Sequence, residues 1–231
     1  MKILAIDTCT DACSAALLIN DEVSERFQVA PRQHATLILA MMQSVLDEAG
    51  LTLNQLDALA FSCGPGAFTG VRLATSVVQG AGFGADLPVV PVSSLAALAH
   101  GLFSDTGHRQ ILAALDARMQ EVYWGAYEIN AEYYPVLVTS ESVVAPIAVP
   151  LPAAGAWYGV GSGFGSYEQA LQQRLGSALI GMDASRYPHA RDVAKLGAYG
   201  WQGGSAISAE AAQPTYLRNE VAWKKQPVKK A

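Results

Sequence analysis

The sequence predicts a mixed α/β fold made of two similar lobes, each a β-sheet flanked by helices. Apolar residues form short runs typical of buried strands in some segments and recur at helical spacing in others, so strands and helices alternate along the chain. The order of elements also starts again near the middle, where residues 111–116 (ILAALD) echo residues 3–7 (ILAID), each with an aspartate at the strand end. A chain of 231 residues is long enough to build two such lobes.

The first half is expected to form a three-stranded meander followed by alternating helices and strands. Its predicted strands are short and apolar: 2–7, 12–19, 22–29, 56–62 and 87–92. Its predicted helices carry apolar residues at three- and four-residue steps: about 33–49, roughly 70–84, and 93–103. Gly50 ends the first helix, and Ser93 is the expected N-cap of the third.

The second half is expected to repeat this pattern less clearly. Its predicted strands are 111–116, 121–129, 134–139 and 156–161, and its predicted helices are 166–175 and 188–203. Three prolines limit any helix within 145–154 to a short one. We therefore expect a first lobe at 1–105, a second lobe at 106–215 and a basic, extended C-terminal tail at 216–231.

Composition predicts a globular protein of the cytoplasm. Hydrophobic residues make up 51% of the chain and charged residues 15%, and no apolar run reaches the ~18 residues that span a membrane. The apolar start of the chain contains Asp7, which a signal peptide would not. The cysteines, Cys9, Cys13 and Cys63, are odd in number and lack metal-ligand spacing, so we expect small buried residues in a reducing compartment.

Charge is unevenly distributed along the chain. The net charge is −5, but 218–231 holds five of the fifteen basic residues and one acid, which gives this segment +4 and leaves −9 for the rest. A body this acidic is not expected to hold nucleic acid by itself, because phosphate contacts dominate that affinity. The tail could touch RNA, although most basic termini are only solvated.

Two halves that each open with a strand ending in aspartate are typical of the duplicated actin-like (ribonuclease H-like) ATPase fold. The residues that could form its nucleotide-like cleft are Asp7, Thr8, Thr10, Gly64, Gly66, Thr69 and Asp116. A hairpin that wraps phosphate with its backbone N–H groups calls for glycine two residues past the acid, because a Cβ blocks the approach. Cys9 occupies that position, which favours an inherited strand end over a working phosphate loop.

Two further clusters leave alternatives open. After the turn at 64–66, Thr69 could cap the next helix. The exposed backbone N–H groups at the start of that helix, together with Arg72 one turn further on, would suit an anion. A rigid strand-to-helix elbow without a ligand explains the same glycines equally well. Near the second aspartate, Arg118 could pair with either Asp7 or Asp116, and such an ion pair would fill an empty cleft.

Motifs for catalysis or metal binding are missing from the sequence. No two of the four histidines lie four residues apart, and no G-x-S-x-G elbow occurs. No catalytic or metal-binding residue is therefore predicted.

Four motifs in order resemble the TsaB family, also called YeaZ: KILAIDT at 2–8, CGPGAFTGVR at 63–72, DARMQEVYW at 116–124 and YLRNEVAWKK at 216–225. The resemblance implies an actin-like fold and a non-catalytic partner subunit. Such a subunit binds and supports a TsaD-type transferase in forming threonylcarbamoyladenosine in tRNAs that read codons beginning with adenine. A TsaE-type ATPase would join through the complex, tRNA would be met indirectly, and ATP and a metal ion would belong to the partner subunits.

The same resemblance locates a missing metal pair and an interface. TsaD-type sequences carry two metal-binding histidines where this chain has Ser94 and Leu98. Pairing with the transferase, or with a second copy of this chain, would use the helices at about 33–49 and 70–84. The candidate interface residues are Leu37, Met41, Ala74, Val77, Val78 and Ala81, each of which could equally be ordinary core.

Two other functions compete with a partner role. The aspartates and the turn at 64–66 would also suit an independent actin-like ATPase or small-molecule kinase. A peptidase would need a nucleophile–base pair or a metal pair, and the sequence has neither.

Overall fold

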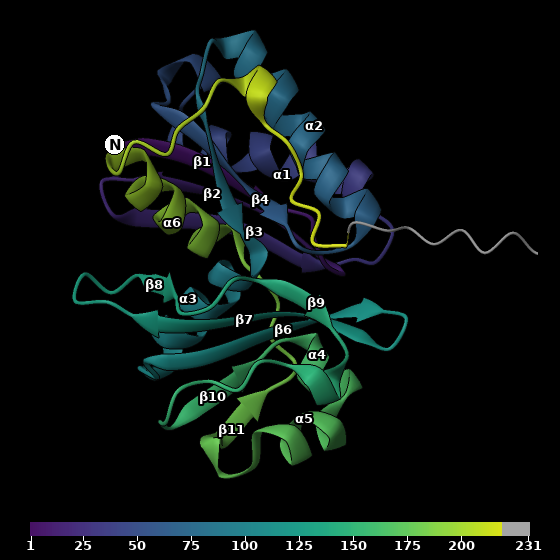
Figure 1. Ribbon diagram of the computed structural model, residues 1–231. Helices are drawn as coiled ribbons and strands as arrows, with labels where there is room; N and C mark the ends of the chain where they lie inside the picture. The colour runs from purple at the N-terminus through teal and green to yellow at the C-terminus, as the bar shows by residue number, and fades with distance from the viewer. Residues whose placement is uncertain (219–231) are drawn as a thin grey trace, which may run out of the picture.

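The computed structural model describes residues 1–218 and contains two lobes, each built on a β-sheet with helices packed against it (Figure 1). This confirms the predicted fold class. No helix within these residues is both long and apolar enough to cross a membrane.

The first sheet has the strand order β3-β2-β1-β4-β5. Its strands are β1 (Lys2–Asp7), β2 (Ala12–Ile19), β3 (Glu22–Val29), β4 (Ala58–Gly64) and β5 (Val89–Ser93). The first three form the predicted antiparallel meander, whereas β4 and β5 run parallel to β1. Asn20 and Asp21 both have positive φ, as a tight two-residue hairpin turn requires.

Helices cover both faces of this sheet. α1 (His34–Ala49) and α2 (Phe68–Ala85) pack on one face, and α6 (Ala190–Gln202) packs on the other, against β1, β2 and β4. Successive side chains of β1 point to opposite faces of the sheet and so belong to two separate core clusters. Leu4 and Ile6 pack on the side of α1 and α2, whereas Ile3 and Ala5 pack on the side of α6. α6 lies within the range expected for the second lobe, yet it packs on the first sheet.

The second sheet has the order β11-β10-β6-β7-β8, with β9 also paired to β7. Its strands are β6 (Gln110–Arg118), β7 (Glu121–Ile129), β8 (Pro135–Leu137), β9 (Ser142–Val144), β10 (Trp157–Val160) and β11 (Leu179–Asp183). β6 pairs antiparallel with β7 and parallel with β10, just as β1 pairs with β2 and β4. The predicted echo of 3–7 in 111–116 is therefore a structural repeat.

Three helices belong to the region around the second sheet. α3 (Ser94–Thr106) packs on β6 and β7 and also against α6, while α4 (Ser162–Ser166) and α5 (Glu168–Leu175) lie on the opposite face. Ser93 caps α3 as predicted, because its hydroxyl accepts from two backbone N–H groups. Two strands, β9 and β11, were missed by sequence, and 145–154 contains only a short 3-10 turn at Pro146–Ala148.

After α6 the chain returns along α2, where Figure 1 shows it in yellow. We call residues 212–218 the C-terminal strap. It is held to the first lobe by a hydrogen bond from Gln79 Nε2 to the Ala212 carbonyl (2.9 Å) and by one from the Thr215 N–H to the Cys63 carbonyl (2.7 Å). Beyond Arg218, the predicted tail lies outside the described residues.

Candidate functional site

Asp7 ends β1 at the carboxyl edge of the first sheet and is completely buried. Its Oδ1 accepts from the Cys9 N–H (3.2 Å), and its Oδ2 has no hydrogen-bond partner among the described residues. Burial raises the pKa of Asp7 to about 6, because a charged carboxylate would lose its hydration there. Because Asp7 is completely buried, its carboxyl is not open to solvent, from which a metal–nucleotide pair would have to bind.

The hairpin after Asp7 is sealed by the chain itself. A Cβ added at Gly66 would lie 2.4 Å from the Cys9 carbonyl oxygen, and one at Gly70 would lie 2.0 Å from the Thr8 carbonyl oxygen. The Thr8 hydroxyl donates to the Gly70 carbonyl at 2.7 Å. The 64–66 turn and the start of α2 therefore lie directly on the hairpin, which explains these glycines without a phosphate.

Cys9 reinforces this closure. Its side chain is buried, and its Sγ donates to the Ser62 carbonyl at 3.2 Å. Burial and the neighbouring Asp7 raise the pKa of the Cys9 thiol well above its ordinary value, so it stays neutral. The three cysteines within residues 1–218 are all buried and free, as expected from the sequence.

The second aspartate lies across an interlobe cleft of about 510 Å³. The Asp116 carboxylate accepts from Arg118 Nη1 (3.1 Å), from the Arg118 N–H (2.8 Å) and from the Tyr167 hydroxyl (3.2 Å). The ion pair with Arg118 is thus present, and second-lobe donors occupy the carboxylate.

The predicted cleft residues separate into two groups. Thr10, Gly66 and Asp116 line the cleft, whereas Asp7, Thr8 and Gly64 are buried and Thr69 is exposed outside its lining. Thr69 does not cap α2, because the helix begins at Phe68 with Ala67 as its N-cap.

Ser94 and Leu98, where the resemblance described above would place a metal-binding histidine pair, are both completely buried. Nearby His100 is hydrogen-bonded through Nδ1 to Asp192 Oδ1 at 2.7 Å, a contact that joins α3 to α6. Within residues 1–218 no three His, Cys, Asp or Glu side chains gather as metal ligands would.

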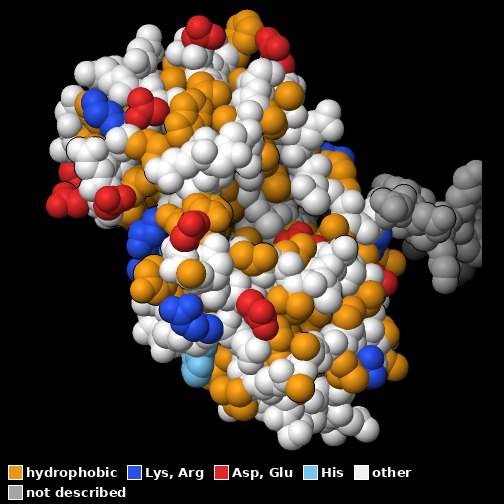
Figure 2. Space-filling model, turned by 60° about the vertical axis from the view of Figure 1, so that its left-hand side comes forward, with side chains coloured by type: hydrophobic (Ala, Val, Ile, Leu, Met, Phe, Trp, Pro, Cys, Tyr) orange, Lys and Arg blue, Asp and Glu red, His pale blue; other side chains and the backbone are white. Residues whose placement is uncertain are grey.

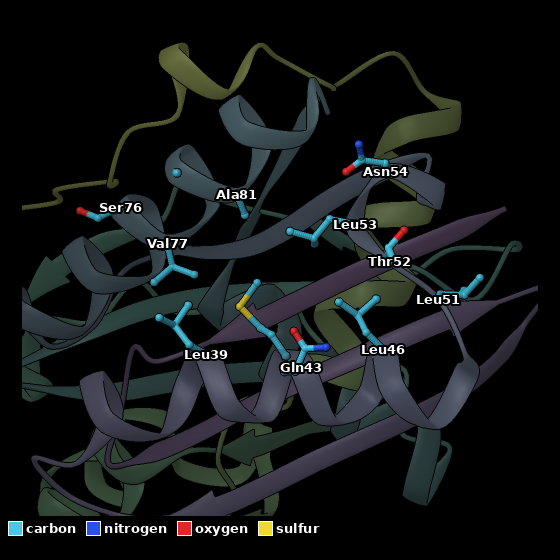
Figure 3. A pocket seen from close by; sticks show the side chains of 12 residues that line it. Leu39, Gln43, Leu46, Leu51, Thr52, Leu53, Asn54, Ser76, Val77 and Ala81 are labelled. Carbon is cyan, nitrogen blue, oxygen red and sulfur yellow. The ribbon is translucent and has the colours of Figure 1, made fainter.

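A second hollow lies on the first lobe, between α1 and α2. Figure 3 shows this groove, whose volume is about 750 Å³, with side chains from both helices and from the 51–54 segment pointing into it. Most of the lining is apolar, including Leu39, Met42, Leu46, Leu53 and Val77. Leu39 is 61% exposed although it lies on a packed helix. Such an apolar hollow on a surface is typical of a protein contact.

The predicted interface residues fall partly in this groove. Val77 and Ala81 line it, and Leu37 and Met41 are half-buried against the adjacent core. Ala74 and Val78 are buried in that core, so their side chains are not available to a partner.

Sequence reasoning missed Leu39 and the polar groove residues Gln43 and Ser76. The sequence does carry a signal for Leu39. Ile38, Met42 and Val45 form the buried face of α1, so an additional leucine outside that face indicates an exposed apolar surface.

Comparison with known proteins identifies relatives. Residues 27–225 match the family described as TsaD, tRNA N6-adenosine threonylcarbamoyltransferase. The chain is 39% identical to the tRNA threonylcarbamoyladenosine biosynthesis protein TsaB of Escherichia coli K12, over 99% of this chain and 100% of that protein. It is 37% identical to the protein of the same name from Haemophilus influenzae, over 98% of each.

Two solved structures from Pseudomonas aeruginosa are similar over 94% of this chain and 99% of their own. One is described as YeaZ, with a TM-score of 0.87 and 43% identity. The other is described as an uncharacterized protein with similarity to peptidase YeaZ, with a TM-score of 0.88 and 44% identity.

Proposed function

The chain belongs to the TsaB (YeaZ) family, and from this membership we propose that it takes part in forming threonylcarbamoyladenosine in tRNA as a non-catalytic partner subunit. It binds a TsaD-type transferase and supports its action on tRNAs that read codons beginning with adenine. The observation that carries the partner role is the apolar groove between α1 and α2.

The groove has the properties of a helix-docking surface. Leu39 and Val77 offer apolar area, whereas Ser76, Gly80 and Ala81 are small and let another helix approach closely. A Cβ added at Gly80 would meet no atom within 4 Å, so the space above α2 is open. A second copy of this chain would use the same surface, and it would then compete with the transferase.

The state of the cleft supports the absence of catalysis by this chain. Asp7 is buried with a raised pKa, the hairpin is covered by Gly66 and Gly70, and Asp116 is held by Arg118. We therefore assign ATP and the metal ion to the partner subunits, with a TsaE-type ATPase joining through the complex.

Reconstitution tests this proposal. Transferase, ATPase and a supply of threonylcarbamoyl-adenylate are mixed with unmodified tRNA, with and without this chain, and modified nucleoside is measured. We expect modification to require this chain. Unchanged modification in its absence would end the proposal.

The groove has its own test. Ala81→Arg should abolish co-elution with the transferase, because it places a charged side chain in the apolar hollow. Ala131→Arg, at an exposed turn of the second lobe, is the matched control and should co-elute normally. Equal co-elution of both variants would move the contact elsewhere.

The cleft of about 510 Å³ keeps an independent ATPase or small-molecule kinase as the second candidate. Calorimetry of the isolated chain with ATP and magnesium separates the two. We expect no binding heat, and saturable heat would favour the enzyme.

A further inference from the structure

Three buried side-chain oxygens without a hydrogen-bond partner among the described residues lie at the carboxyl ends of β1 and β4 and at the start of α3. They are Asp7 Oδ2, Ser62 Oγ and Ser94 Oγ, and none of the three residues has any exposed surface. A buried polar oxygen that makes no hydrogen bond costs free energy, so such groups are rare in folded proteins. Three of them in one region of the core require a common explanation.

The strand order brings these residues together. β4 pairs with β1 on one side and with β5 on the other, and β5 leads directly into α3. The parallel register pairs Ile6 with Phe61, which places Asp7 beside Ser62 at the ends of their strands. Ser94 is the first residue of α3. The three side chains thus belong to the same edge of the first sheet.

Neighbouring groups show how close these side chains are. Burial raises the pKa of Asp7, and the Ser62 hydroxyl opposes this effect from beside the carboxyl. Burial and the charge of Asp7 raise the pKa of the Cys9 thiol, and the Ser94 hydroxyl opposes them. Cys9 Sγ also donates to the Ser62 carbonyl at 3.2 Å, so Cys9 neighbours both serines. Within residues 1–218, however, neither hydroxyl has a partner at hydrogen-bond geometry.

Asp7 differs in this respect from the other buried acid among residues 1–218, which is Asp192. On the face drawn in Figure 2, other acidic side chains lie at the surface, where water can hydrate them. Asp192 is matched on both oxygens, because His100 Nδ1 lies 2.7 Å from Oδ1 and Arg191 Nε lies 3.7 Å from Oδ2. Among the described residues, the Asp7 carboxyl is met only by the Cys9 N–H, on Oδ1. Its second oxygen needs a partner of another kind.

We propose that one buried water molecule is bound between Asp7 Oδ2, Ser62 Oγ and Ser94 Oγ. Buried waters typically make about three hydrogen bonds to polar groups that would otherwise be unpaired. A water both donates and accepts, as the two serine hydroxyls do, so it can serve Asp7 whether the carboxyl is protonated or charged. A metal ion fits less well, because hard cations take about six or more oxygen ligands.

The water joins the two lobes at the point where the chain passes between them. It connects the ends of β1 and β4, in the first sheet, to the start of α3, the helix that packs on β6 and β7 of the second sheet. This binding site is separate from the groove between α1 and α2, and nothing in it depends on the proposed function.

A crystal structure of the full chain, at a resolution that shows ordered solvent, tests the site directly. We expect density for one water within hydrogen-bond distance of all three oxygens. A lack of density at this position would overturn the proposal, whether the oxygens stay apart or bond directly to one another.

Urea denaturation of serine variants gives an independent test. Ser62→Ala and Ser94→Ala should each lower the urea midpoint, because each removes one of the hydrogen bonds that hold the water. An unchanged or raised midpoint would overturn the proposal, since deleting an unpaired buried hydroxyl is neutral or stabilising. Ser205→Ala, at an exposed position after α6, is the control and should leave the midpoint unchanged.

The double variant separates a shared water from two separate partners. When two residues hold one water, the first substitution already weakens its binding, so the second costs less. The midpoint of Ser62→Ala/Ser94→Ala should therefore fall by less than the sum of the two single shifts. Shifts that add in full would mean that the two hydroxyls share no ligand, and the proposal would then be wrong.

Discussion

Replacing Asp7 with asparagine should stabilise the protein, and most of the gain should appear as the pH rises from 4 to 6. Burial raises the pKa of this carboxyl from 3.8 to about 6 in the folded state. The folded protein therefore binds the Asp7 proton more tightly than the unfolded chain does. The stability that neutral Asp7 contributes is fully present below pH 3.8, is lost as the pH rises through about 6, and stays constant above it.

The size of the effect follows from the shift in pKa. About two pKa units at 1.36 kcal/mol each give about 3 kcal/mol, of which about 2 kcal/mol fall between pH 4.5 and 7.5. Asparagine keeps the acceptor for the Cys9 N–H and removes the titration. The free-energy difference between Asp7→Asn and the parent should thus grow in favour of the variant by about 2 kcal/mol over this range.

Urea denaturation at a series of pH values measures this difference. Asp86→Asn, at an exposed position just after α2, is the control and should follow the parent throughout. A difference between Asp7→Asn and the parent that stays flat from pH 4.5 to 7.5 would refute the reasoning, because it would mean that Asp7 ionises in the fold without penalty.

The same variant also bears on function. In the reconstituted reaction, Asp7→Asn should support tRNA modification as well as the parent does. Loss of modification with normal binding to the transferase would instead favour a catalytic Asp7.

Two other predictions concern the sealed hairpin and the strap. Gly70→Ala should lower the free energy of unfolding by roughly 2–4 kcal/mol in urea denaturation, because its Cβ would lie 2.0 Å from the Thr8 carbonyl oxygen. Gly84 lies on the same helix, and a Cβ added there would meet no atom within 4 Å, so Gly84→Ala should raise the free energy of unfolding by about 0.5–1 kcal/mol. Similar effects of Gly70→Ala and Gly84→Ala on this free energy would contradict the close packing at Gly70. Arg218→Gln should speed amide hydrogen exchange in the strap by removing the contact with Glu121, while changing global stability by less than about 1 kcal/mol. Unchanged exchange would show that the strap is held from the first lobe alone.

Most of the first lobe could be predicted because its signals are local. The strands at 2–7, 12–19 and 22–29 match the structure residue for residue, since alternation and a turn at Asn20 and Asp21 specify them. Ser93 and Gly50 likewise mark helix ends by their own chemistry, a side-chain cap and a left-handed residue.

What sequence missed depends on contacts between distant segments. β11 (Leu179–Asp183) is a strand only because it adds to the edge of β10, and its own residues are partly exposed. The return of α6 to the first sheet depends on Gly197, where a Cβ would lie 2.5 Å from the Cβ of Ala60. Neither relation is visible in a local pattern.

The candidate site follows the same division. Asp7 and Asp116 could be found from the repeat, but only the structure places one in the core and the other among second-lobe donors. The buried Ala74 and the exposed Leu39 show the same limit on α2 and α1, because helical spacing gives the faces of a helix without saying what covers each.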